Sequence, residues 1–315
     1  MAAPVGLRGN YADLYGSAQL PVLEFLFRSA IKQYPSRRDV LLNKRSTDRD
    51  IWQYSEMHDL PLMNAITEGD NYTFARAKAG ASKTLSIVKY GLGISVSEEL
   101  IADGKFDLLG DMIRKLGKSA MESQEIAGMD LLNNGFTAST GTLTADGLSL
   151  FNTAHTLPGG LTFRNRPSVD VDLSPSALDS ALSDFATQFV GDSGIKMMIK
   201  PKYLVVPAGL ERYAKELVQS QNKADTADNN MNPFLQDNLQ VVMSPHLTDA
   251  DAWFLAAGPG VLDENGVVVI VREGIQTKGA GPDVGFANDG VFYKTRYREA
   301  VGALHPYGWY GSAGA

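Results

Sequence analysis

Histidine is the side chain that most often moves protons near neutral pH, so the four histidines of this 315-residue chain are the first candidates for chemistry. They are His58, His155, His246 and His305. No two of them stand four residues apart, and none lies in the HExxH pattern that presents two ligands to zinc. Only His155, in NTAHT, invites a catalytic interpretation, and we favour a loop histidine held by hydrogen bonds. The histidines therefore predict no catalytic or metal site.

Motifs for the other common chemistries are missing from the sequence. The chain has no cysteine, which excludes a thiol nucleophile, a disulfide and a zinc–thiolate site. It contains neither the GxSxG turn of hydrolases nor the GxxxxGK[ST] phosphate loop. The acidic runs Ser97-Glu98-Glu99 and Asp225–Asp228 lack the alternating ligand spacing of a calcium loop, so acidic surface explains them better. We expect no catalytic, cofactor-binding or metal-binding residues, no cofactor and no enzyme. A soluble enzyme whose dispersed carboxylate or histidine site is assembled only by folding stays open.

The net charge and the hydropathy of the chain limit the classes of partner that it can have. The net charge of −7 argues against a protein that condenses nucleic acid by neutralising it, so any contact with nucleic acid should be local and weak. No run of about eighteen apolar residues is present, which predicts no membrane-spanning helix. The N-terminal MAAPVGLRGNYADLYG lacks the charged and apolar regions of a secretory signal.

The longest regular element is predicted over residues 105–134. Its apolar side chains repeat at helical spacing, no proline interrupts it, and Asp103-Gly104 and Asn134-Gly135 end it on both sides. Each internal glycine costs about 1 kcal/mol relative to alanine in a helix. We therefore expect a neighbouring element to pack closely against the helix at its glycines, which are Gly110, Gly117 and Gly128.

The residues before this helix indicate an extended arm and a hairpin. VLEFLFRSAIKQYP predicts one helix that ends before Pro35, and the mixed charges of residues 36–50 predict a solvated segment. A segment that pairs with charges on another copy is the alternative. DNYTFARAK (70–78) and KTLSIVKY (83–90) alternate as strands do and predict a long hairpin joined at 79–81. A two-stranded ribbon is marginal alone in water, so a neighbouring subunit is a natural support for it.

The residues after the helix indicate a second body. Residues 135–175 form a long irregular connection, of the kind that is more often functional or interfacial than idle. Helices and strands alternate from 174 to about 271, beginning with Ser174-Pro175 as N-cap and first helical residue. A strand follows from Val291, and the aromatic C-terminus should be packed. The fold class is therefore α+β.

The order of these elements resembles that of tailed-phage major capsid proteins with the Hong Kong 97 fold, and more specifically the Mu-like phage major head subunit family. The resemblance covers about residues 60–310. The stretches that carry it are DGLSLFNTAHTL (146–157), KPKYLVVPAGLERYAKELV (200–218), NPFLQDNLQVVMSPHL (232–247) and DAWFLAA (251–257).

The resemblance implies a domain organisation with no catalytic or cofactor residues. Its parts would be an N-terminal arm (1–59), an extended β-hairpin loop (60–95), a peripheral domain (96–171 and 266–315) with its spine helix at 105–134, and an α/β axial domain (172–265) whose tip is loop 222–232. The glycines of the spine helix would mark where the sheet of the peripheral domain crosses it closely, so a bulky residue at Gly117 should impair assembly more than a change at Lys118. Some relatives join a loop lysine to a neighbour's asparagine; Lys78 and Lys83 lie in that region, but ordinary exposed lysines explain them better.

The resemblance also implies a function. The chain would be the major capsid protein of a tailed double-stranded DNA bacteriophage, forming pentamers and hexamers of an icosahedral shell around the genome. Its partners would be itself, scaffold, portal and possibly decoration proteins, with weak non-specific contact to packaged DNA and no membrane. It would be assembled in the cytoplasm of the bacterial host and reside in the virion. An encapsulin-like nanocompartment shell is the runner-up, and a tail structural protein fits less well.

Overall fold

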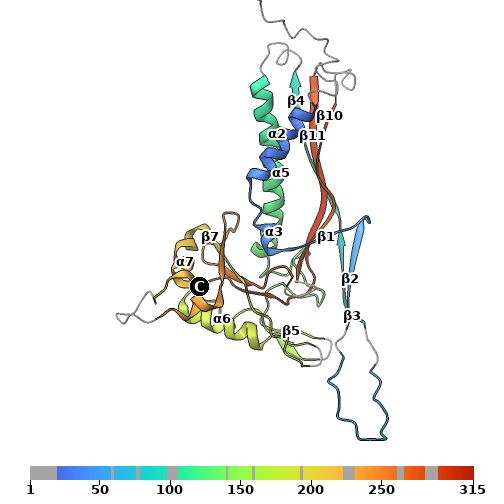
Figure 1. Ribbon diagram of the computed structural model, residues 1–315, viewed down its shortest axis with the longest axis vertical. Helices are drawn as coiled ribbons and strands as arrows, with labels where there is room; N and C mark the ends of the chain where they lie inside the picture. The colour runs from blue at the N-terminus through green and yellow to red at the C-terminus, as the bar shows by residue number, and fades with distance from the viewer. Residues whose placement is uncertain are drawn as a thin grey trace, which may run out of the picture. The chain divides into compact units, whose positions relative to one another are not determined.

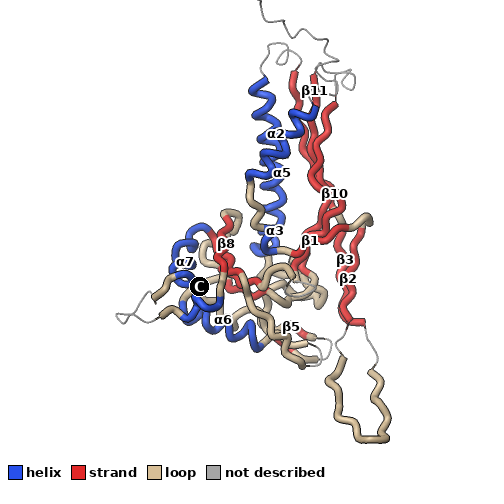
Figure 2. Tube along the Cα trace, in the orientation of Figure 1, coloured by secondary structure: helices blue, strands red, loops and turns tan. Residues whose placement is uncertain are grey.

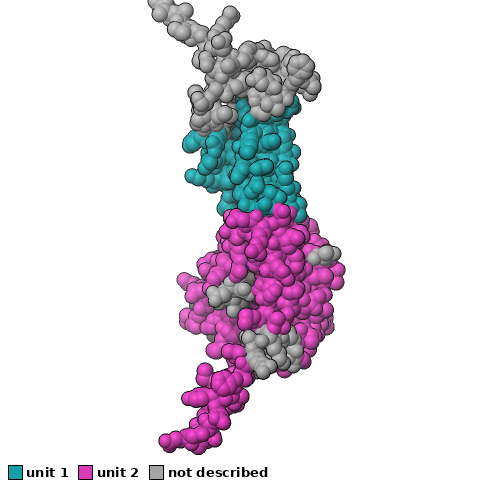
Figure 3. Space-filling model, turned by 90° about the vertical axis from the view of Figure 1, so that its right-hand side faces the viewer, with its two compact units in different colours: residues 1–36, 88–124, 272–299 teal, residues 37–87, 125–271, 300–315 magenta. Residues whose placement is uncertain are grey.

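The protein is described here by a computed structural model that covers residues 20–57, 60–75, 79–97, 106–139, 141–157, 160–191, 194–222, 231–260, 266–280 and 290–315. The chain divides into two compact units (Figure 3). The described parts of residues 1–36, 88–124 and 272–299 form unit 1, and those of 37–87, 125–271 and 300–315 form unit 2. Helix α5 (Phe106–Asn133) and the strands β10 (Val267–Ala280) and β11 (Gly290–Ala303) contribute residues to both units.

Unit 1 packs two helices on strands. Figure 1 shows α2 (Leu20–Gln33) beside α5, and both cover one face of β4 (Val88–Ser97), β10 and β11. Strand β4 runs antiparallel to β11, with Tyr90 opposite Tyr297 and Val96 opposite Val291. The core between helices and strands consists of Phe27, Val96, Leu109, Ile113, Leu116 and Tyr293. The predicted helices at 22–34 and 105–134 are both confirmed, although Asp103, Gly104 and Lys105 lie outside the described residues.

The glycines of α5 mark close packing, as predicted, but against helices and not against a sheet. A Cβ atom added at Gly110 would lie 3.5 Å from Leu26 of α2, and one at Gly117 would lie 3.2 Å from the Phe27 ring. The third site belongs to unit 2, where a Cβ atom at Gly128 would lie 2.6 Å from the Arg38 side chain. The predicted sheet contact was wrong because the N-terminal segment lies against this face of the helix.

The predicted hairpin of unit 2 has a different first strand. Strand β3 (Ala79–Ser86) pairs antiparallel with β2 (Ile51–Met57), not with residues 70–78. Residues 60–75 between them have no strand partner within the described chain, and 76–78 lie outside it. The prediction assumed a short turn, whereas the two strands that pair are joined by a long loop. The segment after Ile87 leaves this ribbon and becomes β4 of unit 1.

The charged segment after Pro35 was predicted to be solvated, and this prediction is wrong for part of it. It forms α3 (Arg38–Leu41) and β1 (Asn43–Ser46), and Arg38 is only 2% exposed. The Glu125 carboxylate accepts the backbone N–H groups of Arg37 and Arg38, each at 3.2 Å. These donors would otherwise lack partners at the start of the short helix. Strand β1 pairs parallel with β10, from Asn43 beside Val268 to Ser46 beside Val271.

The alternating region of unit 2 forms a four-stranded sheet in the order β12-β9-β7-β8. Its strands are β7 (Tyr203–Pro207), β8 (Gln240–Ser244), β9 (Trp253–Ala256) and β12 (Trp309–Ser312). Helix α6 (Pro175–Thr187) begins at Ser174, whose Oγ accepts the Ala177 N–H at 3.2 Å, as predicted. The predicted second helix is α7 (Glu211–Gln219), which buries Ala214 and Leu217 but leaves Tyr213 40% exposed.

The remaining elements of unit 2 are short. Residues 135–174 are mostly irregular, as predicted, and contain the paired two-residue strands β5 (His155–Thr156) and β6 (Thr162–Phe163). Two 3-10 helices, η1 (Ala208–Leu210) and η2 (Pro233–Asp237), adjoin α7 and β8. The aromatic C-terminus is packed, with Tyr307, Trp309 and Tyr310 buried. Within the described ranges, no helix has the length and apolar character needed to cross a membrane.

Candidate functional site

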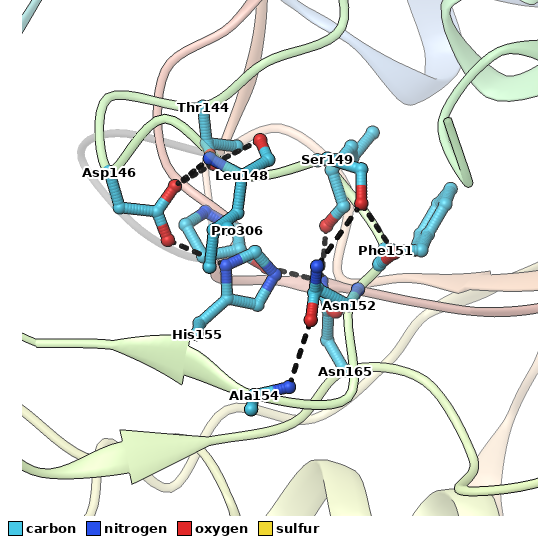
Figure 4. A network of polar contacts seen from close by, with 11 residues as sticks. Thr144, Asp146, Leu148, Ser149, Phe151, Asn152, Ala154, His155, Asn165 and Pro306 are labelled. Carbon is cyan, nitrogen blue, oxygen red and sulfur yellow. Dashed lines mark hydrogen bonds and ion pairs between the residues drawn. The ribbon is translucent and has the colours of Figure 1, made fainter. Parts of the chain in front are cut away.

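His155, the one histidine that invited a catalytic interpretation, belongs to a polar network in unit 2 (Figure 4). Its Nδ1 lies 2.7 Å from Asp146 Oδ2, and its ring is completely buried and stacks on Phe163 at 5.3 Å. The other carboxylate oxygen of Asp146 accepts hydrogen bonds from the Thr144 hydroxyl and, at 3.1 Å, from the Leu148 N–H. The loop from 144 to 148 is thereby tied to strand β5.

A second set of bonds continues this network towards the C-terminus. Asn165, fully buried, accepts the Asn152 N–H at 2.8 Å and donates its amide to the carbonyls of Leu150 and Pro306. One asparagine thus joins three irregular segments that have no sheet to satisfy their backbone groups. The Thr144 hydroxyl donates to Asp146 and not to His155. The network therefore holds the long connection in place.

The negative charge of Asp146 contributes to the stability of this network. Burial raises the pKa of its carboxyl, but the hydrogen bonds from His155 and Thr144, the charge of His155 and the Leu148 N–H outweigh it, so the pKa lies below the ordinary value of 3.8. A carboxyl with a lowered folded-state pKa stabilises the fold above its unfolded-state pKa, and this contribution is lost as the pH falls through the folded value.

We expect Asp146→Asn to lower the free energy of unfolding by about 1 kcal/mol at neutral pH, because 17% of the side chain stays exposed and solvent weakens the interactions. The difference between variant and parent should disappear as the pH falls below the folded-state pKa. Thermal unfolding as a function of pH measures it, with Asp130→Asn, an exposed change on α5, as the control. A difference that persists unchanged in acid would contradict this account.

The other histidines are not brought together. His305 is buried between the rings of Tyr54 and Tyr307, and the backbone of His246 accepts the Asn133 side-chain amide. His58, Glu98, Glu99 and Asp225–Asp228 lie outside the described residues, as does most of loop 222–232. Among the residues that are described, no three histidine or acidic side chains could share a metal ion.

The most unusual surface of unit 2 is the loop of residues 60–75, which Figure 2 shows projecting beyond β2 and β3. Every one of its residues is exposed. Six are large and apolar: Leu60, Leu62, Met63, Ile66, Tyr72 and Phe74, with exposures from 45% to 100%. Single exposed apolar residues are common on soluble proteins, but a contiguous group marks a binding surface. The loop is therefore our candidate site, and the site is one of association.

The lysines considered for covalent linkage adjoin this loop. Lys83 lies on β3 opposite Tyr54, and burial lowers the pKa of its amine from the ordinary value. Lys78 lies outside the described residues. A partly buried lysine in a strand pair is explained by the packing of the ribbon, so covalent linkage gains no support from this position.

Comparisons with known proteins identify the family of the chain. The sequence matches the family described as phage capsid protein over residues 80–312. No curated protein matches the chain. Solved structures share its fold at low identity. The capsid of cyanophage P-SCSP1u aligns with a TM-score of 0.57 and 12% identity, covering 88% of this chain and 87% of that one.

Two further structures extend the comparison. The capsid of bacteriophage JBD30 aligns with a TM-score of 0.57 and 16% identity, covering 79% of this chain and 100% of that one. A virus-like particle from Pyrococcus furiosus aligns with a TM-score of 0.56 and 11% identity, covering 94% and 99%. At such identities the likeness establishes the fold alone. The predicted α+β capsid fold of the Hong Kong 97 type is confirmed.

Proposed function

The chain belongs to the phage capsid protein family, and from this premise we propose that it is the major head subunit of a tailed double-stranded DNA phage. It is a structural shell protein of the virion and not an enzyme, as predicted. In our proposal its copies form the pentamers and hexamers of an icosahedral shell that encloses the genome. The closer assignment to the Mu-like head subunits stays a prediction.

The observation that carries the proposal is the exposed apolar loop of residues 60–75. Closed rings of five and six copies need head-to-tail contacts, in which one surface of a subunit meets a different surface of the next. A projecting loop supplies contact area that a compact globule lacks, and its apolar side chains supply the free energy once they are buried. Exposing these apolar side chains to water costs free energy in a free monomer, and burying them between subunits of a shell removes that cost.

We extend the proposal to the organisation of the chain. Residues 1–59 serve as an arm, 60–95 as the extended loop, 96–171 with 266–315 as the peripheral domain around α5, and 172–265 as the axial domain near the five- and six-fold axes. Loop 222–232 is the proposed axial tip. Strand β12, which this division gives to the peripheral domain, pairs with β9 of the axial domain.

The proposed partners follow from the same function. The chief partner is another copy of the chain. Scaffold and portal proteins guide assembly in the host cytoplasm, decoration proteins bind the outside of some shells, and packaged DNA makes weak, non-specific contacts. The net charge of −7 suits a wall that contains the duplex without binding it tightly.

Negative-stain electron microscopy of the purified protein tests the proposal. We expect closed shells, or rings with five- and six-fold symmetry. Monodisperse monomers under every condition that promotes assembly would contradict it.

A nanocompartment shell is the second candidate, because the virus-like particle from Pyrococcus furiosus has the same fold. The content of particles formed in the native host separates the two. Double-stranded DNA inside supports the phage head, whereas an enclosed enzyme supports the nanocompartment.

Limited proteolysis provides a prediction about the loop. Residues 60–75 should be cut readily in the free subunit, because their backbone is exposed and unpaired within the described chain, and should be protected in shells. The paired strand β3 should resist cutting in both states, which makes it an internal control. Equal cleavage of 60–75 in subunits and shells would count against an interfacial loop.

A further inference from the structure

Strand β4 of unit 1 presents an open edge. It is the terminal strand of the order β1-β10-β11-β4, and within the described chain no strand pairs with its outer side. Exposed edges are templates for another strand, and proteins usually shorten, twist or charge them. This edge is ten residues long and pairs with β11 without a break in register, so it is open to strand addition.

One face of β4 is apolar and only half covered. Residues at every second position share a face, and Ile94 and Val96 of this face pack against the core beneath α5. The face continues through Leu92, Tyr90 and Val88, which are 51%, 40% and 49% exposed.

A cleft lies beside the uncovered half. It measures about 250 Å³ and is lined by Tyr90, Leu92 and Tyr297 of the strands and by Ser119 and Ser123 of α5. Small-molecule sites usually occupy roughly 300–1,000 Å³, so this cleft suits one or two protein side chains better.

The opposite face of the same strands is basic. Lys89 lies directly opposite Arg298, and Arg296 and Lys294 lie opposite Gly91 and Gly93. Like charges that face each other across strands are destabilising. Glu273 pairs with Arg296 at 3.2 Å and with Arg298 at 3.4 Å, whereas Lys89 and Lys294 are exposed. The side chains that β4 and β11 place on this face include no carboxylate. Gly91 and Gly93 have no side chain that would separate Arg296 and Lys294 from a segment that pairs with the β4 edge.

The loop of residues 60–75 has the complementary properties. Besides its apolar residues it carries Glu68 and Asp70 and neither lysine nor arginine. Tyr72 and Phe74 share one face of an extended segment, and the residues around them have the alternation of a strand but no partner in their own chain among the described residues.

From this complementarity we propose that residues 71–75 of one copy add as a strand to the β4 edge of the next copy. Tyr72 and Phe74 cover Val88, Tyr90 and Leu92 beside the cleft, and the acidic turn at Glu68 and Asp70 meets the basic face. Lys89 lies near one end of this stretch of β4, and Lys294 of β11 lies near the other end, opposite Gly93. The acidic turn can therefore meet a lysine whether the added strand runs parallel or antiparallel to β4. This inference rests on the proposed function and names the surface that receives the loop.

Disulfide trapping tests the contact in a chain that has no cysteine of its own. The variants Phe74→Cys/Leu92→Cys and Phe74→Cys/Val88→Cys cover the two strand directions. After oxidation of assembled particles, one of them should give a ladder of covalent multimers on a non-reducing gel. Phe74→Cys alone and Phe74→Cys/Leu108→Cys, which uses an exposed residue of α5, should give none. Closed particles without a ladder from either pair would overturn the docking and leave the shell function standing.

A charge exchange tests the basic face. Lys89→Glu/Lys294→Glu should lower the yield of particles roughly threefold to tenfold, and Glu68→Lys/Asp70→Lys in the same chain should restore it. If the reversal leaves assembly and cross-linking intact and only weakens retention of DNA, the basic face serves the duplex, and the proposed partner is wrong.

Hydrogen exchange on the parent protein covers the case in which the variants fail to assemble. The amides of residues 88–92 that point to the open edge should exchange roughly tenfold slower, or more, in shells than in free subunits. Unchanged exchange there in closed shells would overturn strand addition. Failure of the parent to form any particle would instead refute the proposed function itself.

Discussion

Tyr72→Ser/Phe74→Ser should abolish shell formation and leave the subunit folded. Both side chains are exposed in the monomer, at 75% and 91%, so their loss costs the fold little. Burying each in a contact contributes about 1.5–3 kcal/mol, so each subunit interface should lose about 3–6 kcal/mol. That corresponds to a weakening of association by roughly a hundredfold or more. Sedimentation velocity measures the loss of particles, and circular dichroism confirms the fold.

The matched control changes the two polar residues that directly precede Tyr72 and Phe74. Asn71→Ser/Thr73→Ser alters the same exposed backbone and removes no large apolar side chain. This variant should assemble as the parent does. Equal assembly of both variants would show that the aromatic side chains carry no contact energy.

Gly117→Leu should destabilise unit 1 by about 1–3 kcal/mol. A Cβ atom at this position would lie 3.2 Å from the Phe27 ring and 3.3 Å from the Phe27 carbonyl oxygen, so α2 would have to move away from α5. Gly117→Ala should change stability little, because the helical preference for alanine, worth about 1 kcal/mol, offsets the tight contact. The midpoint and free energy of chemical unfolding separate the two variants.

The control for this series is Lys115→Leu. Lys115 is exposed on the same helix, two residues from Gly117. Lys118 is less suitable, because its ammonium lies 5.3 Å from the centre of the Tyr34 ring and 3.9 Å from Glu122. If Lys115→Leu and Gly117→Leu cost the same, close packing at the glycine is not the reason for its presence.

The regular elements could be predicted from the sequence because their signals are local. The uninterrupted apolar face of α5, the Ser174-Pro175 start of α6 and the strand after Tyr203 each depend on residues a few positions apart. His155 was predicted to be a histidine held by hydrogen bonds, and its bond to Asp146, nine residues away, is also local.

The errors concern partners that are distant in the chain. Arg38 is buried against Gly128, and Glu125, 87 residues away, accepts its backbone N–H. No local pattern reveals such distant partners. Strand β3 pairs with β2 across a long loop, whereas alternation at 70–78 favoured the nearer partner. That alternation is explained if residues 71–75 pair with another copy. The sequence shows that residues 71–75 tend to form a strand, but it does not show whether the partner strand belongs to the same chain or to another copy.

An electron cryomicroscopy reconstruction of assembled particles shows directly whether residues 60–75 form a contact between subunits. We expect a closed shell of five- and six-membered rings in which residues 60–75 of each subunit lie on the adjacent subunit, along β4. A closed shell whose 60–75 loops extend into solvent, or a particle without such rings, would contradict it.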